Sequence, residues 1–368
     1  MLAHLLQQHP DILAPPEPWL MLALEAFGTV DNRHPAGAPL IRGATSEFLG
    51  RIDRRIVARA LADAAYGQYL AATGKRTFID KTPRYWMVLD FLDGLYPEAQ
   101  RIVLFRNPYA IAASVKAKWG IPLSSASCPS AIASCLADLA VGLPPPSIAS
   151  SLADLVLGLP TLAAQRGRHD TLVVRYEHLV AHPEHEVRRA IAALGYDPEQ
   201  LASATVEQTD YLRSSSFGDR KILERRAVDD RSVRIWQMQL TTQEMQAVTD
   251  LVGAELLNEL GYGEELRYAQ QVGVTDRGPA VTEGYRQLFK ACFDLSAGIT
   301  ERGSGVTGLG TQPNSALSQV LESSSSFTSV SSIVREAQGL ADTKIEETLR
   351  LVKFVAAEIE QALTASRR

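Results

Sequence analysis

The stretch Arg101-Ile-Val-Leu-Phe-Arg106-Asn-Pro-Tyr-Ala-Ile-Ala-Ala-Ser114-Val-Lys-Ala-Lys-Trp119 decides the fold of this chain. Its short apolar run after Arg101 is typical of a buried parallel strand. Asn107 and Pro108 are typical of the first positions of a helix. The stretch therefore predicts a strand that leads directly into a helix. Arg106 and Ser114, about two helical turns apart, could then bind one phosphate at the helix N-terminus.

Three short apolar segments separated by helical patterns predict the strands of a parallel sheet. They are Thr77–Asp80, Arg101–Arg106 and Thr171–Tyr176. Alternation of strands and helices is typical of a three-layer α/β fold. In such folds the active residues gather at the carboxyl edge of the sheet, where Lys81, Arg106 and Glu177 follow the three predicted strands.

The Arg-x7-Ser pattern at this corner resembles the 3′-phosphate-binding motif of sulfotransferases that use 3′-phosphoadenosine-5′-phosphosulfate (PAPS). Further segments are similar, in the same order, to blocks of bacterial and tyrosylprotein-type sulfotransferases, namely His9–Glu17, Asp80–Tyr85, Val174–Leu179, Gly218–Lys221 and Ser232–Trp236. Each block alone is weak, but the ordered set is specific. The resemblance covers roughly residues 1–265 and implies an α/β fold with a three-layer parallel sheet of the P-loop nucleotide-binding type.

The resemblance assigns two catalytic residues. Glu17, held among prolines, matches the general base that takes the acceptor proton. Lys81 matches the cation that stabilises the departing bridging oxygen or the sulfuryl group. The alternatives are an ordinary loop carboxylate for Glu17 and a solvated lysine for Lys81.

The resemblance also assigns the residues that bind the donor nucleotide. Arg106 and Ser114 match the 3′-phosphate clamp, and Tyr176 matches a position near adenine, with an aromatic residue at the edge of the core as the alternative. Gly218 and Lys221 match a loop that reaches back to the nucleotide. Arg220 replaces the proline common in this loop, so the loop lacks the fixed φ that a proline provides but keeps its positive charge.

One block of the family pattern has no counterpart. Family members begin with a strand and a loop whose backbone N–H groups bind the 5′-phosphosulfate. Residues 1–10 are similar to the helix that follows this loop. We therefore expect the first strand and loop to be missing and Met1 to be an internal residue of a longer protein. The alternative is a degenerate, non-catalytic relative.

The resemblance implies a PAPS-dependent sulfotransferase whose acceptor is a hydroxyl of a carbohydrate, lipid, peptide or small metabolite. A truncated or degenerate binding or scaffold protein is the alternative from another class. A nucleotide kinase of related topology is disfavoured, because no GxxxxGK[ST] motif occurs in the chain.

Composition narrows the class of protein. The 368 residues carry a net charge of −5, which argues against a nucleic-acid-binding surface. Three cysteines without a CxxC motif or ligand spacing favour a cytoplasmic protein without a metal site. The sequence contains no apolar run of about eighteen residues, so it predicts no integral membrane segment.

The remaining segments predict appendages to the domain of residues 1–265. A helical sequence is duplicated within residues 130–160, which we interpret as an inserted helix, with a substrate-gating role as the alternative. Residues 266–332 predict a short helix and a Gly/Ser-rich linker. Residues 333–368 predict an amphipathic C-terminal helix that either docks on the domain or mediates self-association.

Overall fold

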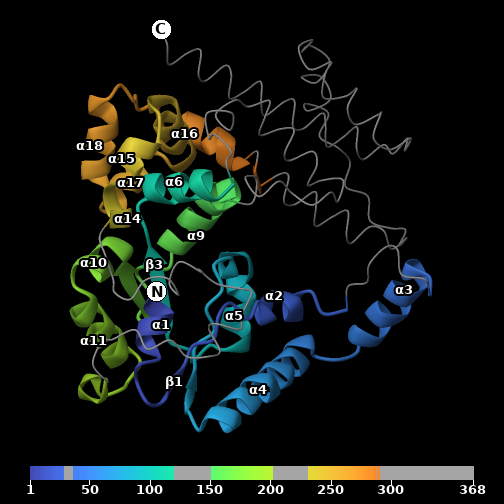
Figure 1. The fold of residues 1–368 in the computed structure, drawn as a ribbon. Coiled ribbons are helices and arrows are strands. Elements are labelled where there is room, and N and C mark those ends of the chain that lie inside the picture. Colours follow the sequence, from blue (N-terminus) through green and yellow to red (C-terminus); the bar gives the residue numbers. More distant parts are fainter. Residues whose placement is uncertain (29–35, 120–150, 202–230, 288, 291–368) are drawn as a thin grey trace, which may run out of the picture. The chain divides into compact units, whose positions relative to one another are not determined.

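The chain forms two compact units in the computed structural model, which describes residues 1–28, 36–119, 151–201, 231–287 and 289–290 (Figure 1). The first unit comprises Met1–Arg106 and Thr161–Val233, and the second comprises Asn107–Pro160 and Arg234–Arg368. The predicted domain of residues 1–265 includes parts of both units, and its boundaries stay a prediction.

Two pairs of parallel strands lie in the first unit. β1 (Ile12–Leu13) pairs with β2 (Thr77–Phe78), and β3 (Arg101–Phe105) pairs with β4 (Thr171–Arg175). The register of the second pair runs from Arg101 opposite Thr171 to Phe105 opposite Arg175. The structure thus confirms a mixed α/β architecture with parallel strands.

We expected a single parallel sheet at the centre of a three-layer fold, and the described residues do not form one sheet. Their four strands make two separate two-stranded sheets, and the P-loop type of the fold stays a prediction. β1 was not predicted as a strand, because two residues are too few for a hydrophobic period. Pro15 and Pro16 follow it closely, and proline cannot donate to a strand ladder, so β1 cannot extend.

The three predicted strands are confirmed with shorter ends. β2 stops two residues before Asp80, and β4 stops at Arg175 because Tyr176 already begins α10. The helices of the first unit are α1 (Leu2–Leu6), α2 (Leu20–Glu25), α3 (Ala38–Leu49), α4 (Arg54–Thr73), α5 (Leu89–Leu95), α10 (Tyr176–Ala181) and α11 (Pro183–Ala193), with short 3₁₀ turns η1 (Tyr85–Val88) and η4 (Pro198–Gln200).

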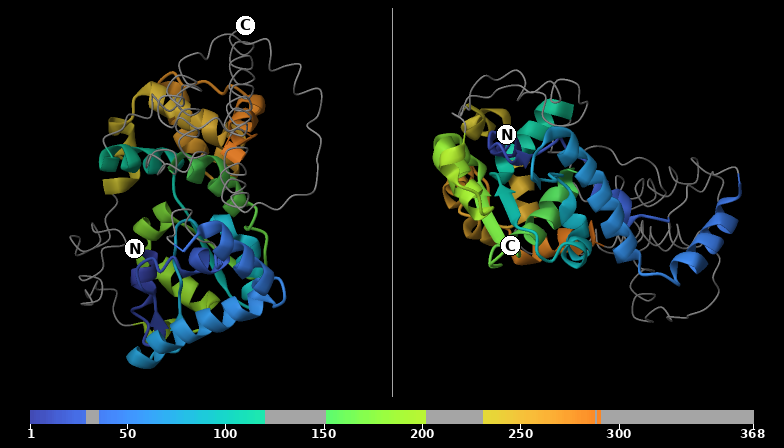
Figure 2. Two further views of the ribbon diagram at one scale, coloured as in Figure 1. Left: turned by 90° about the vertical axis from the view of Figure 1, so that its right-hand side faces the viewer. Right: turned by 90° about the horizontal axis from the view of Figure 1, so that it is seen from below.

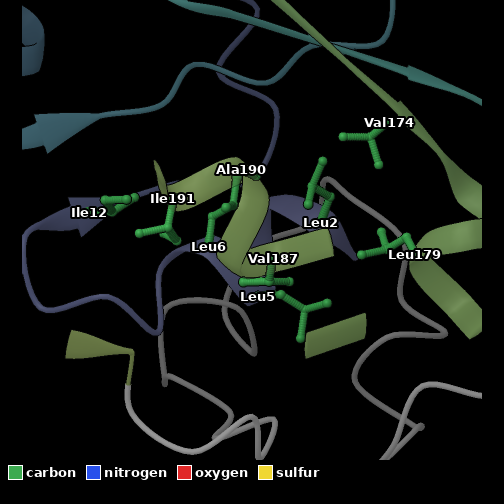
Figure 3. Packing of buried hydrophobic residues seen from close by; sticks show 9 residues of the cluster. All are labelled: Leu2, Leu5, Leu6, Ile12, Val174, Leu179, Val187, Ala190 and Ile191. Carbon is green, nitrogen blue, oxygen red and sulfur yellow. The ribbon is translucent and has the colours of Figure 1, made fainter. Parts of the chain in front are cut away.

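A buried apolar cluster joins β1 and β4 to three helices (Figure 3). Its members come from α1, β1, β4, α10 and α11, and they are Leu2, Leu5, Leu6, Ile12, Val174, Leu179, Val187, Ala190 and Ile191. Burial of apolar side chains is the main stabilising contribution to such a core. The cluster holds β1 and β4 in one unit although they belong to different sheets.

α4 runs for 20 residues as one continuous helix (Figures 1 and 2). It begins after Asp53, whose side chain accepts hydrogen bonds from the backbone N–H groups of Arg55 and Ile56. It ends at Gly74, where φ is 68°, a left-handed conformation that glycine adopts without strain. Asp53 and Gly74 therefore set the two ends of this helix from the local sequence.

The described part of the second unit is helical. Its elements are α6 (Pro108–Trp119), the π-helical turn η3 (Asp154–Gly158), α15 (Trp236–Gln239), α16 (Thr242–Val252), α17 (Ala254–Glu259) and α18 (Gly263–Gln271), and α9 (Leu159–Ala163) and α14 (Arg231–Arg234) cross between the units in sequence. No helix within the described residues is long and apolar enough to span a membrane.

Buried aromatic side chains join α6 to the other helices of the second unit. The Tyr109 ring stacks on the Trp236 ring with centroids 4.9 Å apart, and the Tyr268 ring meets Trp236 edge-on. The Tyr109 hydroxyl hydrogen-bonds the Thr249 hydroxyl at 2.8 Å. These contacts fix α6, the helix that the sequence predicted after Arg106.

Several predicted segments lie outside the described residues. The first copy of the duplication is among them, whereas residues 151–160 of the second copy are helical, as expected. The predicted linker and C-terminal helix also lie outside, except for residues 266–287 and 289–290. Self-association through residues 333–368 therefore stays a prediction.

Candidate active site

Glu17 and Lys81 meet in the first unit. Glu17 follows β1 and Lys81 follows β2, and the carboxyl ends of two paired parallel strands lie at the same edge. The Lys81 Nζ donates to the Glu17 Oε1 at 2.8 Å across 64 residues of sequence. The Glu17 side chain is 19% exposed and that of Lys81 is 44% exposed. The structure thus brings together the two residues expected to be catalytic and leaves both accessible.

The backbone around Glu17 is strained. Its φ is 27° and that of Trp19 is 56°, and these are the non-glycine residues with positive φ in the described part of the chain. Each such residue costs on the order of 1–3 kcal/mol and persists only where its surroundings hold it. Strain of this kind clusters at functional sites, so the segment 17–19 is a candidate for one.

Two hydroxyl groups hold the strained segment from outside. The Trp19 backbone N–H donates to the Thr82 Oγ1, and the Met21 backbone N–H donates to the Tyr85 hydroxyl, each at 3.3 Å. Met21 is also buried in an apolar cluster that joins α2 to α4 and α5, formed by Met21, Leu24, Ala58, Ala62 and Leu95. The Glu17 segment is therefore bound on its C-terminal side by hydrogen bonds and by packing.

Asp80 lies behind these hydroxyls. The Tyr85 hydroxyl donates to the Asp80 Oδ2 at 2.7 Å, the Tyr66 hydroxyl donates to the same oxygen, and the Thr82 hydroxyl lies 3.4 Å from Oδ1. Burial raises the pKa of Asp80, although hydrogen bonds from Tyr66, Tyr85 and Thr82 oppose the shift. Burial and the Asp80 carboxylate raise the pKa of Tyr66 and of Tyr85, so both phenols stay protonated.

The sequence interpretation missed these supporting residues. Asp80, Thr82 and Tyr85 all belong to the block Asp80–Tyr85, of which only Lys81 was given a role. The available signal was the block itself, because it places three polar side chains within five residues of Lys81. Tyr66 lies on α4, and nothing in the sequence connects it with this block.

Arg106 and Tyr176 meet at the end of the other strand pair. Arg106 follows β3 and Tyr176 follows β4, and the Arg106 guanidinium carbon lies 4.5 Å from the centre of the Tyr176 ring. Arg106 also donates to the Ser232 carbonyl oxygen at 3.4 Å, and the hydroxyls of Tyr176 and Ser232 are 2.8 Å apart. Ser232 is a contact that the sequence did not predict, although it begins one of the similar blocks.

The charge of Arg106 is incompletely satisfied. Within the described part of the first unit no carboxylate pairs with it, and its buried Nε has no hydrogen-bond partner. A buried donor left without a partner costs roughly 1–3 kcal/mol. A guanidinium group in this position could donate charge-assisted hydrogen bonds to a phosphate oxygen.

Ser114 lies on α6 in the second unit and is half-buried. The predicted start of this helix is confirmed, because α6 begins at Pro108 and the Asn107 Oδ1 accepts from the Tyr109 backbone N–H at 2.9 Å. Lys116 anchors α6 by donating to the Glu244 carboxylate and to the Gln239 carbonyl oxygen, each at 2.8 Å. Arg106 and Ser114 belong to different units, so their pairing stays a prediction.

Gly218 and Lys221 lie outside the described residues, so their predicted contact with the nucleotide stays a prediction. In the part of the chain that the structure describes, no group of three or more His, Cys, Asp or Glu side chains could hold a metal ion. The candidate site therefore consists of the Glu17–Lys81 pair with its Asp80 support, and of the Arg106–Tyr176–Ser232 cluster.

A family pattern and a curated relative identify the family of this chain. The pattern of the Sulfotransferase family matches residues 1–200. The chain is 59% identical over 366 residues to Nodulation protein NoeE of Sinorhizobium fredii, covering 100% of this chain and 86% of that protein. A solved structure, the Sulfotransferase Domain from the Curacin Biosynthetic Pathway, matches 71% of this chain and 92% of its own with a TM-score of 0.44 and 17% identity. The resemblance seen in the sequence is confirmed, and the chain belongs to the sulfotransferase family.

Proposed function

We propose that this protein transfers the sulfuryl group of PAPS to a hydroxyl acceptor. The observation that carries the proposal is the contact between Glu17 and Lys81, which brings a carboxylate and an ammonium together at the carboxyl ends of two parallel strands. A proton acceptor and a cation are the two groups that sulfuryl transfer requires. Family membership supports sulfuryl transfer in general.

The two side chains would act on opposite sides of the transferred group. A bond forms between the acceptor oxygen and the sulfur while the bond from sulfur to the bridging phosphate oxygen breaks. Glu17 takes the hydroxyl proton, and Lys81 stabilises the negative charge on the leaving phosphate. In the structure each is the other's partner, so a bound donor would replace Glu17 as the partner of Lys81.

Arg106 supports the choice of a nucleotide donor. Its guanidinium follows β3 with a buried Nε that has no partner within the described residues, and a phosphate of the donor would satisfy it. We propose that Arg106 and Ser114 bind the 3′-phosphate and that Tyr176 lies near adenine. The loop with Gly218 and Lys221 would reach back to contact the nucleotide. None of these roles needs a metal ion.

The proposed base suits a hydroxyl acceptor. A carboxylate suits the removal of a proton from a neutral hydroxyl during transfer. The 59% identity to Nodulation protein NoeE extends over the whole chain, so we propose that the two proteins use the same acceptor. We place the protein in the cytoplasm, because its three cysteines show no disulfide or metal spacing.

The test is a transfer assay with ³⁵S-labelled PAPS and acceptors that carry either hydroxyl or amine groups, with product nucleotide binding measured in parallel by calorimetry. We expect label on hydroxyl acceptors and binding of adenosine 3′,5′-bisphosphate. Nucleotide binding without transfer to any acceptor would instead favour the non-catalytic binding protein. Absence of both would contradict the proposal entirely.

A further inference from the structure

We propose that Asp80 is a positioning residue that fixes the general base Glu17 through the hydroxyl groups of Tyr85 and Thr82. The inference rests on the proposed role of Glu17. The hydrogen-bond partners of Asp80 within the described residues are Tyr66, Thr82 and Tyr85, so its effect on Glu17 would pass through two hydroxyls to the backbone of the segment that carries Glu17.

The direction of the hydrogen bonds is the first argument. The Tyr85 hydroxyl has one proton, which it donates to the Asp80 Oδ2, so its lone pairs remain for the Met21 backbone N–H. The Thr82 hydroxyl lies 3.4 Å from the Asp80 Oδ1 and also hydrogen-bonds the Tyr85 hydroxyl, while its oxygen accepts from the Trp19 backbone N–H. An acceptor at position 80 thus makes both hydroxyls acceptors toward the segment.

The two links are unequal. Tyr85 lies 2.7 Å from Asp80, whereas Thr82 lies 3.4 Å away, beyond the usual range for two oxygens. The Tyr85 link should therefore be the stronger one. The Thr82 side chain is buried, so water cannot easily replace its hydrogen bond with the Trp19 backbone N–H. This burial makes the Thr82 link matter despite its greater distance from Asp80.

The strained backbone is the second argument. Positive φ values at Glu17 and Trp19 require an external hold. Trp19 and Met21, whose N–H groups are bound by these hydroxyls, lie at or just after the strained residues. Without the hold, the segment would relax and the Glu17 carboxylate would leave its place beside Lys81.

Tyr66 provides a matched control. Its hydroxyl donates to the same Asp80 oxygen as that of Tyr85, but the Glu17 segment donates nothing to it. Its ring stacks on Phe78 at 4.2 Å, a contact that Tyr66→Phe keeps. Tyr66→Phe and Tyr85→Phe therefore each remove one hydrogen bond to Asp80, and only the second removes a link to the segment.

The experiment measures hydrogen–deuterium exchange of the Trp19 and Met21 amides in the full chain. We expect exchange of the Met21 amide to accelerate roughly tenfold in Tyr85→Phe, because one hydrogen bond is lost. Thr82→Val should accelerate the Trp19 amide, and Thr82→Ser should restore it. Asp80→Asn should affect at least one of the two amides, since its amide group has one acceptor oxygen where the carboxylate has two. Tyr66→Phe should leave both within about twofold of the wild type.

Turnover gives the functional readout. Tyr85→Phe and Thr82→Val should lower kcat for sulfuryl transfer while leaving the affinity for adenosine 3′,5′-bisphosphate unchanged, and Thr82→Ser should recover kcat. Equal exchange in Tyr66→Phe and Tyr85→Phe would overturn the inference, as would normal kcat in Tyr85→Phe. If the wild type transfers no sulfuryl group but the exchange pattern holds, the proposed function fails and the hold on the segment stands.

Discussion

Two ion pairs of equal length lie in different surroundings in this chain. Lys81 and Glu17 in the first unit are 2.8 Å apart, as are Arg277 and Asp250 in the second. The Glu17 side chain is 19% exposed, whereas that of Asp250 is 1% exposed. The two pairs therefore share the distance between the charges but differ in the burial of the carboxylate, as the proposed catalytic role of the first pair and a structural role of the second would require.

The surroundings of the two carboxylates explain the difference. Asp250 accepts from the Gln246 Nε2 at 2.8 Å, and Gln246 in turn accepts from the Thr275 backbone N–H, so this pair ties α16 to the segment after α18. Glu17 has a strained backbone and an accessible partner. An exposed pair contributes about 0–1 kcal/mol to stability, whereas breaking a buried pair costs about 3–5 kcal/mol.

The largest effect that we expect is on turnover, from Glu17→Gln. The amide has nearly the same shape but cannot take the acceptor proton, so transfer should slow by roughly 10²–10⁴-fold. Folding and nucleotide affinity should stay as in the wild type. Kinetics with labelled PAPS and calorimetry with the product nucleotide measure the two quantities. Near-normal turnover would show that Glu17 is not the general base, and the Glu17–Lys81 pair could then no longer be contrasted with Asp250–Arg277 as a catalytic pair.

We expect the buried Asp250 to make the free energy of unfolding depend on pH. Burial raises the pKa of Asp250 from 3.8 to about 6, although Gln246 and Arg277 oppose the shift. Because the folded-state pKa is above the unfolded value, the contribution is fully present below pH 3.8 and is lost as the pH rises through about 6. The loss amounts to at most about 3 kcal/mol.

Urea unfolding of the wild type and of Asp250→Asn at several pH values between about 4 and 7 measures this loss as a difference. The variant should lack the fall in unfolding free energy that the wild type shows, and contributions from other groups such as Asp80 cancel between the two proteins. Parallel pH curves for the two proteins would show that Asp250 does not titrate as inferred.

Arg106→Ala should weaken binding of the product nucleotide by about 1.5–3 kcal/mol, since a charge-assisted hydrogen bond is lost. Arg106→Lys is the matched variant, because it keeps the charge but not the planar fork, and it should recover only part of the affinity. Calorimetry measures both. An unchanged affinity in Arg106→Ala would mean that the cation above Tyr176 serves the fold alone.

The sequence predicted the positions of strands better than the arrangement of the sheets. The apolar runs after Arg101 and Thr171 marked β3 and β4 within one residue, because a buried strand needs little more than a short apolar run. β1 was not predicted, because Ile12 and Leu13 are too few residues to show a hydrophobic period. The pairing of strands depends on contacts between distant residues, which the order of elements does not specify.

The site was predicted by resemblance more than by physics. The family blocks named Glu17 and Lys81 separately, but their contact needed the parallel pairing of β1 and β2. The positive φ of Glu17 and Trp19 could not be predicted, because neither is glycine. Asp80 was overlooked although it precedes Lys81 directly, since a supporting carboxylate is recognised only from what it contacts.

The smallest effect concerns the stability contributed by the exposed pair. Lys81→Met keeps the apolar stem and removes the charge, and Lys81 is 44% exposed. We therefore expect the free energy of unfolding to change by no more than about 1 kcal/mol. Arg277→Met is the matched control, because it leaves Asp250 buried beside Gln246 without its cation, and it should cost about 3–5 kcal/mol.

Urea unfolding at pH 7 compares the two variants directly, and at this pH Asp250 is mainly ionised because its pKa is about 6. If Lys81→Met destabilised the protein as much as Arg277→Met, the Glu17–Lys81 pair would be a structural clamp for the strained segment, and loss of turnover in its variants would no longer indicate chemistry. If only Arg277→Met destabilised it, the exposed pair would be free of a structural role. Any loss of transfer in Lys81→Met would then reflect the charge that Lys81 presents to the leaving phosphate.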